Sequence, residues 1–571
     1  AALLKGLEEK GILKIVSKQI YRDPLSDNRV VAKTKVLNEE QRTIVEQFIT
    51  DFDAGIRKDY LIHGVTGSGK TEVYMEMIDK VLSEGRQAIV LIPEIALTYQ
   101  TVMRFYTRFG GRVSILNSRM SQGERYDQME RVKKGEVDIM IGPRSALFTP
   151  FERLGLIVID EEHEPTYKSE QVPRFHARET AIERARMEGA SVVLGSATPS
   201  LEAFYACECG RYQMLRLRNR TGKQALPEVY VADMREELKH GNRSILSDRL
   251  KLLMQDRLEK KEQIMLFLNR RGYAGFVSCR ACGYVVKCPH CDVSLTYHKD
   301  THTMRCHYCD FQVPYQQKCS HCGSTNIKLI GSGTQKIEEY LQNNFINSRV
   351  IRYDVDSTRK KQGHHQLLKQ FENQEANILI GTQMIAKGLD FENVTFVGVI
   401  NADLSLNIPD FRANERTFQL LEQVSGRSGR GKKQGTVMIQ TYNPDHFVLQ
   451  CVKNHDYQSF YQKEMEMRKL AKYPPYCYLI SILVQGKKED DVTFCSQQIK
   501  EYLVKQLPKA IVLGPANCTI YKMNDIYRKR MTLKITNTTH VYEVLHAMSD
   551  YYNKKGRKVN VICDFNPYTT I

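Results

Sequence analysis

Gly64-Val65-Thr66-Gly67-Ser68-Gly69-Lys70-Thr71 matches the spacing G-x-x-x-x-G-K-[ST]. The apolar run 60–62 precedes it, and apolar residues at helical spacing follow it from Val73 to Leu82. A loop between a strand and a helix is the context in which this pattern binds a polyphosphate, because backbone N–H groups and the helix N-terminus attract negative charge. Lys70 is therefore expected to pair with the β- and γ-phosphates of ATP, and Thr71 to hold Mg²⁺. A chance glycine-rich turn is the alternative, which the strand–helix context disfavours.

The composition points to a large protein that meets a polyanion. The chain has 571 residues, a net charge of +17 and a pI of about 9.1. It contains no run of 18 apolar residues, so we expect no transmembrane helix and no membrane partner. It begins without Met or a signal peptide, which predicts that an N-terminal part is missing. Of 15 cysteines, eight form four C-x-x-C pairs, which favours metal binding in a reducing cytoplasm.

Short apolar runs alternate with helix-like segments over most of the chain and predict an α/β fold with parallel sheets. The first series lies at 88–92, 137–141, 155–159 and 190–194, and the second at 263–268, 349–354, 377–381, 394–400 and 436–440. We predict four domains: 1–33, the end of a winged-helix-like domain; 34–225, a first ATP-binding lobe; 226–450, a second lobe with a metal-binding insertion at 276–326; and 451–571, a C-terminal α+β domain. An ordinary surface helix is an equal alternative for 1–33.

An acidic cluster ends one of the apolar strands. Ile157-Val158-Ile159 runs into Asp160-Glu161-Glu162-His163, which fits a Walker B element. Asp160 is expected to bind Mg²⁺ through water, and Glu161 to orient and deprotonate the attacking water. Such a cluster alone is usually a solvated loop, but it follows a phosphate loop and a buried-type strand here.

Two arginines in the second half suit a phosphate-facing junction. The chain reads Gln423-Val424-Ser425-Gly426-Arg427-Ser428-Gly429-Arg430. Guanidinium groups stabilise the charge of a transferring phosphoryl group, so Arg427 and Arg430 are predicted to act across the lobes, which would link ATP turnover to lobe closure. A basic surface helix is the alternative. The hydroxyls of Ser196-Ala197-Thr198 are a candidate link from the nucleotide site to its lobe.

The eight clustered cysteines predict two zinc sites. Their spacing is Cys279-x₂-Cys282-x₅-Cys288-x₂-Cys291-x₁₄-Cys306-x₂-Cys309-x₉-Cys319-x₂-Cys322. Four knuckles form two tetrahedral Cys₄ sites without an open position for catalysis. Nested pairing gives Cys279, Cys282, Cys319 and Cys322 one Zn²⁺, and Cys288, Cys291, Cys306 and Cys309 the other; interleaved pairing stays open. We expect the neighbouring His290, His307 and His321 not to be ligands.

Aromatic and basic residues interleave directly after the acidic cluster, from Tyr167 to His176. Such interleaving suits base stacking and backbone contact with single-stranded DNA, so Tyr167, Phe175 and His176 are candidate DNA contacts. Packing of these aromatic side chains onto the lobe is the alternative.

The ordered motifs resemble those of superfamily 2 helicases, which have two RecA-like lobes. The matching elements are 64–71, 93–98, 160–163, 196–198, 381–384 with Gly388, and 423–430. The resemblance implies that Gln41 reads the adenine of ATP, that Gln423 belongs to the catalytic set, and that the loop 167–176 couples DNA binding to hydrolysis.

The eight-cysteine insertion after 267–273, together with 142–148 and 410–416, resembles the primosomal protein N′ (PriA) family of bacterial replication-restart helicases. That family implies an ATP-dependent 3′-to-5′ DNA helicase that remodels abandoned forks and reloads the replicative helicase. It further implies a DNA contact at Arg144, forked and single-stranded DNA as substrates, and partnership with single-stranded DNA-binding protein, primosome proteins and helicase loaders at the nucleoid. The family's N-terminal 3′-end-binding domain is expected to be absent from this sequence.

Two other functions compete with the helicase prediction. A fork-binding scaffold would recruit partners through the zinc module and the tail, with ATP hydrolysis secondary. A double-strand translocase or a nuclease-associated motor is a third hypothesis, which the absence of a further acidic cluster resembling a nuclease site disfavours.

Overall fold

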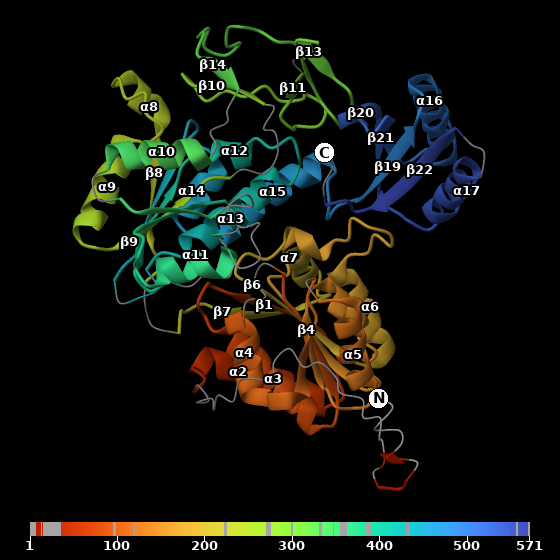
Figure 1. Ribbon diagram of the computed structural model, residues 1–571. Helices are drawn as coiled ribbons and strands as arrows, with labels where there is room; N and C mark the ends of the chain where they lie inside the picture. The colour runs from red at the N-terminus through yellow and green to blue at the C-terminus, as the bar shows by residue number, and fades with distance from the viewer. Residues whose placement is uncertain are drawn as a thin grey trace.

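The computed structural model describes most of the chain. The described residues are 7–8, 10–12, 14, 36–94, 99–118, 120–221, 225–269, 276–298, 301–329, 334–345, 348–353, 363–382, 385, 391–429, 431, 433–554 and 558–568. Nearly all of the predicted winged-helix remnant lies outside them, as do residues 95–98, 270–273, 383–384, Gly388 and Arg430 of the sequence motifs. Figure 1 shows two lobes, a small insertion above the second lobe, and a separate C-terminal domain.

The first lobe is built on a seven-stranded parallel sheet in the order β3-β4-β2-β5-β6-β1-β7. Its strands are β1 (Asp59–Gly64), β2 (Gln87–Leu91), β3 (Val113–Ile115), β4 (Ile139–Gly142), β5 (Leu154–Asp160), β6 (Ser191–Ser196) and β7 (Gln213–Leu217). Its helices are α2 (Glu39–Asp53), α3 (Lys70–Ser83), α4 (Tyr99–Phe109), α5 (Gln122–Lys133), α6 (Ala177–Glu188) and α7 (Leu201–Glu208), with 3₁₀ turns η1 (Gly110–Arg112), η2 (Arg144–Phe148) and η3 (Pro165–Tyr167). The central strands are buried throughout because helices cover both faces.

The second lobe repeats this layered architecture with six parallel strands in the order β15-β16-β9-β17-β18-β8. They are β8 (Glu228–Asp233), β9 (Gln263–Phe267), β15 (Val350–Tyr353), β16 (Ile378–Gly381), β17 (Val394–Val399) and β18 (Thr436–Thr441). The helices are α8 (Met234–Lys239), α9 (Asp248–Glu259), α10 (Thr334–Asn344), α11 (Gly363–Glu372), α12 (Asp403–Leu406), α13 (Ala413–Ser425), α14 (Phe447–Lys453) and α15 (Tyr457–Ala471). The predicted doubly covered α/β lobes are thus confirmed.

The domain boundary predicted after residue 450 falls within helix α14. Helices α14 and α15 bury Val448, Phe460 and Met465 in the same apolar core as Val397 and Phe418 of the second lobe. The same cluster contains Leu201 and Phe204 of α7, so α14 and α15 pack at the junction of the two lobes, and the first strand of the C-terminal sheet begins at Tyr478.

The insertion between β9 and α10 consists of short strands and turns. They are β10 (Val277–Cys279), β11 (Thr296–His298), β12 (Thr303–Arg305), β13 (Gln312–Pro314) and β14 (Ile327–Leu329). Strand β10 pairs with β14, and β11, β12 and β13 form an antiparallel meander. Three-residue strands bury little apolar area, so the module needs another source of stability.

The C-terminal domain is an antiparallel sheet in the order β20-β21-β19-β22. Its elements are β19 (Tyr478–Gly486), α16 (Glu489–Gln506), β20 (Ile511–Met523), β21 (Ile526–Ile535), α17 (Val541–Asn553) and β22 (Val559–Phe565). The two helices pack on one face of the sheet around Ile480, Ile499 and Val544, which confirms the predicted α+β class. None of the described helices combines the length and apolar character that a bilayer span requires.

Candidate nucleotide site, lobe interface and metal centres

The phosphate loop joins the carboxyl end of β1 to the first turn of α3. Gly67 and Gly69 have φ values of 83° and 77°, a left-handed conformation that glycine adopts without strain. The Ser68 N–H donates to the Val65 carbonyl at 3.0 Å and shapes the turn. Lys70 Nζ donates to the Gly64 carbonyl at 2.8 Å, so its ammonium lies folded over the loop that is predicted to receive phosphate.

Gln41 supports the phosphate loop from helix α2. Its Nε2 donates to the carbonyls of Ser68 at 2.9 Å and Gly69 at 3.4 Å, while its Oε1 accepts from the Asn38 N–H. A side chain on Gly69 would collide with this amide, which explains why glycine stands there. The structure therefore places Gln41 against the loop, and its reading of adenine stays a prediction.

Asp160 and Glu161 lie at the end of β5, two strands from β1 in the sheet. The Tyr74 hydroxyl donates to Asp160 Oδ1 at 3.1 Å. Burial, assisted by the neighbouring Glu161 carboxylate and opposed by Lys70, raises the pKa of Asp160 to about 6. Glu161 has a φ of 48°, uncommon for a residue with a side chain. A poorly solvated carboxylate at the carboxyl edge of a parallel sheet suits a bound cation, so these residues fit Mg²⁺ of ATP.

His163 joins the acidic strand end to the second lobe. Its Nε2 lies 2.8 Å from Gln423 Nε2 of α13, and its Nδ1 lies 2.7 Å from the Ser196 hydroxyl. An amide nitrogen only donates, so His163 Nε2 accepts and its proton must sit on Nδ1. His163 is buried at 3% exposure, and both of its ring nitrogens contact a polar side chain. The chain thus carries a specific hydrogen bond between the Walker B segment and helix α13.

The carboxyl end of α13 approaches the phosphate loop. A Cβ built on Gly426 would lie 2.9 Å from Thr66 Cγ2, so the two lobes are in contact at this point. Arg427 follows directly, and its N–H donates to the Val424 carbonyl at 3.1 Å. Arg427 is thus the next residue after this contact between the lobes, and its catalytic role stays a prediction. Arg430 lies outside the described residues.

The loop after the Walker B segment lies differently from the prediction. Tyr167 is 1% exposed, and its hydroxyl donates to the Leu91 and Asp160 carbonyls at 3.0 and 2.7 Å. His176 is also buried, and its Nδ1 accepts from the Arg178 N–H at the start of α6. Direct stacking of either ring on a base is therefore a wrong prediction for this conformation; both rings are structural.

Phe175 is half-buried in this loop and packs against the core of the first lobe. Its ring meets that of Phe148 edge to face at a centroid distance of 5.0 Å, and Phe148 is 55% exposed. The two rings form an aromatic surface patch suited to stacking. Phe148 was not predicted, although its place beside Arg144 in the 142–148 motif was a usable signal.

Arg144 is held by the loop itself. Its Nη1 donates to the Thr166 and Lys168 carbonyls at 2.7 and 2.9 Å. Because two carbonyls already engage the guanidinium, Arg144 acts here as a support for the loop, and its direct contact with DNA stays a prediction.

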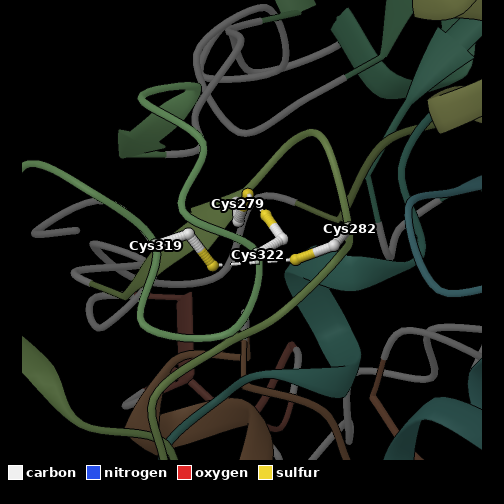
Figure 2. A group of neighbouring side chains, drawn as sticks. All are labelled: Cys279, Cys282, Cys319 and Cys322. Carbon is white, nitrogen blue, oxygen red and sulfur yellow. Dashed lines mark hydrogen bonds between the residues drawn. The ribbon is translucent and has the colours of Figure 1, made fainter.

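The eight predicted ligand cysteines form two compact clusters in the insertion. Within each cluster the four Sγ atoms lie within 4.8 Å of one another; the clusters are Cys279, Cys282, Cys319 and Cys322, and Cys288, Cys291, Cys306 and Cys309. Figure 2 shows the first cluster, where the sulfurs of four side chains converge. This geometry matches the nested pairing and fits two tetrahedral Zn²⁺ ions.

The four knuckles share one backbone design. The residue after each second cysteine has positive φ and donates its N–H to the carbonyl of the first cysteine: Gly283 to Cys279, Asp292 to Cys288, Asp310 to Cys306, and Gly323 to Cys319. His307, which we expect not to bind zinc, contacts the Asn517 carbonyl of the C-terminal domain through its Nδ1 at 3.0 Å. In the described residues the metal-binding groups of the insertion are cysteines alone.

Models of known protein families match both lobes, the cysteine-rich insertion and the C-terminal domain. Residues 38–205 match the DEAD/DEAH box helicase model, 323–432 the helicase conserved C-terminal domain, 288–314 the PriA DNA helicase Cys-rich region domain, and 469–568 the primosomal protein N C-terminal domain. The replication restart protein PriA of Bacillus subtilis is 46% identical over 573 residues, covering 100% of this chain and 71% of that protein. The chain belongs to the PriA family.

Other relatives support the same membership. PriA of Synechocystis sp. is 46% identical over 83% of this chain and 58% of its own length, and PriA of Chlamydia pneumoniae is 39% identical over 99% of this chain and 76% of its own length. The chain thus spans part of each PriA relative. The family match covers the lobes, the cysteine-rich insertion and the C-terminal domain described above.

A buried charge network between the lobes was not predicted from the sequence. Arg468 of α15, 2% exposed, pairs with Glu415 at 2.6 Å and Glu464 at 3.3 Å, and it approaches Glu202 of α7. Arg412 also pairs with Glu202 at 3.4 Å. Removing one partner of a buried ion pair destabilises a protein strongly, because the other charge is left buried and unpaired. The network therefore fixes how α7 of the first lobe packs against the second lobe.

Cys306→Ser is expected to release one of two zinc ions per chain and to disorder part of the insertion. A structural zinc site stabilises such modules by roughly 10–16 kcal/mol, and serine is a poor zinc ligand. ATPase activity should partly survive, since each lobe has its own core. Metal analysis of purified protein checks this, with Cys209→Ser, an exposed cysteine outside both clusters, as the control. Retention of two ions by Cys306→Ser would contradict the ligand assignment.

Asp160→Asn is expected to raise the melting temperature of nucleotide-free, Mg²⁺-free protein at neutral pH by a few degrees. The pKa of an unfolded Asp is near 3.8 and that of the folded Asp160 is about 6. The ionised carboxylate therefore lowers the free energy of unfolding fully above pH 6, and this destabilisation decreases as the pH falls below 6. Asparagine removes the charge at every pH. Thermal unfolding at pH 7.5 and at pH 5 checks this, and the gain should shrink at the lower pH.

The control for this experiment is Asp256→Asn. A hydrogen bond from Lys260 lowers the pKa of Asp256, so its replacement should not stabilise the protein. A melting temperature that falls for Asp160→Asn at neutral pH would show that the carboxylate is well accommodated without a cation.

Proposed function

We propose that this protein is an ATP-dependent DNA helicase that acts in bacterial replication restart. The observation that carries the proposal is the hydrogen bond of 2.8 Å between Gln423 and His163, because it links the second lobe to the Walker B segment, three residues after the acid that ends β5. A motor that converts hydrolysis into movement between lobes needs such a connection at the nucleotide. The +17 net charge and the PriA-family domains agree with a DNA substrate.

The chain's own residues supply the parts of phosphoryl transfer. The phosphate loop offers backbone N–H groups and Lys70 to the triphosphate, and Asp160 with Thr71 would hold Mg²⁺, which neutralises phosphate charge when bound. Glu161 would orient and deprotonate a water molecule. Arg427 would stabilise the transferring group from the second lobe. The requirement for both lobes makes turnover sensitive to their relative position.

Finer features of the proposal come from family membership. They are translocation in the 3′-to-5′ direction, remodelling of stalled or abandoned forks, and reloading of the replicative helicase. Contact with single-stranded DNA-binding protein, primosome proteins and helicase loaders belongs to the same proposal, as does action in the cytoplasm at nucleoid-associated forks. A scaffold with secondary ATP use is disfavoured, because phosphate loop, acidic pair and lobe contact all fit catalysis together.

A strand-displacement assay on two matched duplexes tests this function. One duplex carries a single-stranded 3′ tail and the other a 5′ tail of the same sequence length, with ATP and Mg²⁺ present. We expect displacement on the 3′-tailed duplex only. Equal displacement of both, or displacement on the 5′ tail alone, would overturn the polarity; tight fork binding with no displacement on any tailed or forked substrate would favour the scaffold.

A further inference from the structure

The last described segment of the chain, residues 564–568, runs from the C-terminal sheet to the lobe interface. Arg412 Nη1 of the second lobe donates to the Pro567 carbonyl at 3.0 Å, and Arg416 donates to the Tyr568 carbonyl. The Tyr568 hydroxyl donates to the His163 carbonyl of the first lobe at 3.3 Å. The segment therefore touches the Walker B region and helix α13 together, although it lies about 400 residues from His163 in sequence.

Asp564 of this segment binds the basic side chains of the loop 164–176. Lys168 Nζ lies 2.9 Å from Asp564 Oδ1, and Arg174 Nη1 lies 3.5 Å from Asp564 Oδ2. Lys168 Nζ also donates to the Phe565 carbonyl at 2.7 Å. The side chains of Lys168 and Asp564 are only 5% and 13% exposed, so each charge depends on the other for its stabilisation.

The carboxylate of Asp564 lies between a lysine and an arginine, an arrangement that also suits a phosphate group. Both are compact oxyanions that accept charge-assisted hydrogen bonds from ammonium and guanidinium groups. The loop begins only a few residues after Glu161 and carries the half-buried Phe175 beside the exposed Phe148. Basic and aromatic side chains interleave in it, a composition that suits contact with a nucleic-acid backbone. Its two basic groups are nevertheless engaged by an acid from the chain's own C-terminal domain.

We propose that Lys168 and Arg174 form a binding site for a phosphodiester of single-stranded DNA, and that Asp564 fills this site until DNA displaces it. Displacement frees the segment 564–568, including the contact of Tyr568 with the His163 carbonyl, and so lets the Walker B segment adjust for hydrolysis. This inference rests on the proposed helicase function. The competing view is that Asp564 merely fastens the C-terminal domain to the first lobe.

The Asp564→Asn variant separates the two views, because the proposal predicts that it responds to lower concentrations of DNA than the wild type. The amide keeps the shape of Asp564 and removes the negative charge that competes with phosphate. We expect the concentration of oligo(dT) that half-maximally stimulates ATP hydrolysis to fall by about fivefold or more, and the DNA-free rate to rise. If the ion pair is only structural, the variant should have a lower melting temperature and an unchanged or higher half-maximal DNA concentration. An unchanged or a higher half-maximal DNA concentration would overturn the inference.

Two further variants sharpen the test. Asp491→Asn breaks the 2.9 Å ion pair with Lys558 within the same domain and should leave the half-maximal concentration unchanged. In a Lys168→Met/Arg174→Gln background, where the site itself is lost, adding Asp564→Asn should no longer increase DNA sensitivity. A persisting gain there would show that the carboxylate acts elsewhere and would overturn the assignment. Absence of any DNA stimulation in the wild type would instead count against the proposed function.

Discussion

Lys70→Ala is expected to abolish DNA-stimulated ATP hydrolysis, a fall of at least roughly 10³-fold in kcat, while binding of forked DNA persists. The Lys70 ammonium lies over the phosphate loop at the carboxyl end of β1, where it would meet the charge of the triphosphate. We expect basic groups elsewhere in the chain to hold the DNA, so that its binding has a separate origin. Phosphate release and fork-binding titrations measure the two properties independently.

Lys80→Ala is the matched control for Lys70. It removes a lysine from the same helix, but Lys80 pairs with Asp53 and Glu84 away from the phosphate loop. The control should keep near-wild-type turnover. Undiminished turnover in Lys70→Ala would overturn the assignment of the nucleotide site, and loss of fork binding together with turnover would indicate misfolding of the first lobe.

Arg427→Ala is expected to lower kcat by roughly 10³-fold or more while changing ATP affinity little. An arginine that reaches the γ-phosphate from the opposite lobe acts chiefly in the transition state. The close approach of Gly426 to Thr66 places the neighbouring Arg427 where lobe closure can present it. Steady-state kinetics combined with binding of a fluorescent nucleotide separates the two effects.

The control for Arg427 is Arg249→Ala, an arginine of the second lobe that lies over the Tyr230 ring, outside the site. It should retain wild-type kcat. A weakened nucleotide affinity with an unchanged kcat in Arg427→Ala would remove the transition-state role and leave the residue as an ordinary phosphate ligand.

Much of the catalytic lobe could be predicted because its signals are local. The phosphate loop and Asp160 each follow an apolar strand, and carboxyl ends of parallel strands meet at one edge of a sheet. The zinc clusters could also be predicted from the sequence, because four C-x-x-C pairs and the loop lengths between them restrict which cysteines can form one site.

The lobe interface could not be predicted, because its contacts join residues far apart in sequence. The cross-lobe pair Arg412–Glu202 is separated by 210 residues, and the contact of Lys168 with Phe565 of the C-terminal domain by 397, and no periodicity marks either. Tyr167 shows a second limit. The residues around Tyr167 suit DNA contact, but its hydroxyl lies within hydrogen-bond distance of two backbone carbonyls inside the lobe. The ring is buried because its polar group is satisfied there.

Strand displacement on a forked duplex with a 3′ single-stranded tail tests the central claim most directly, namely that ATP turnover between these lobes drives unwinding. The wild-type protein with ATP and Mg²⁺ should displace the strand, and Lys70→Ala, at a concentration that saturates the fork, should displace none. Displacement by Lys70→Ala at the wild-type rate, or a wild-type protein that hydrolyses ATP on this fork without separating its strands, would contradict the claim.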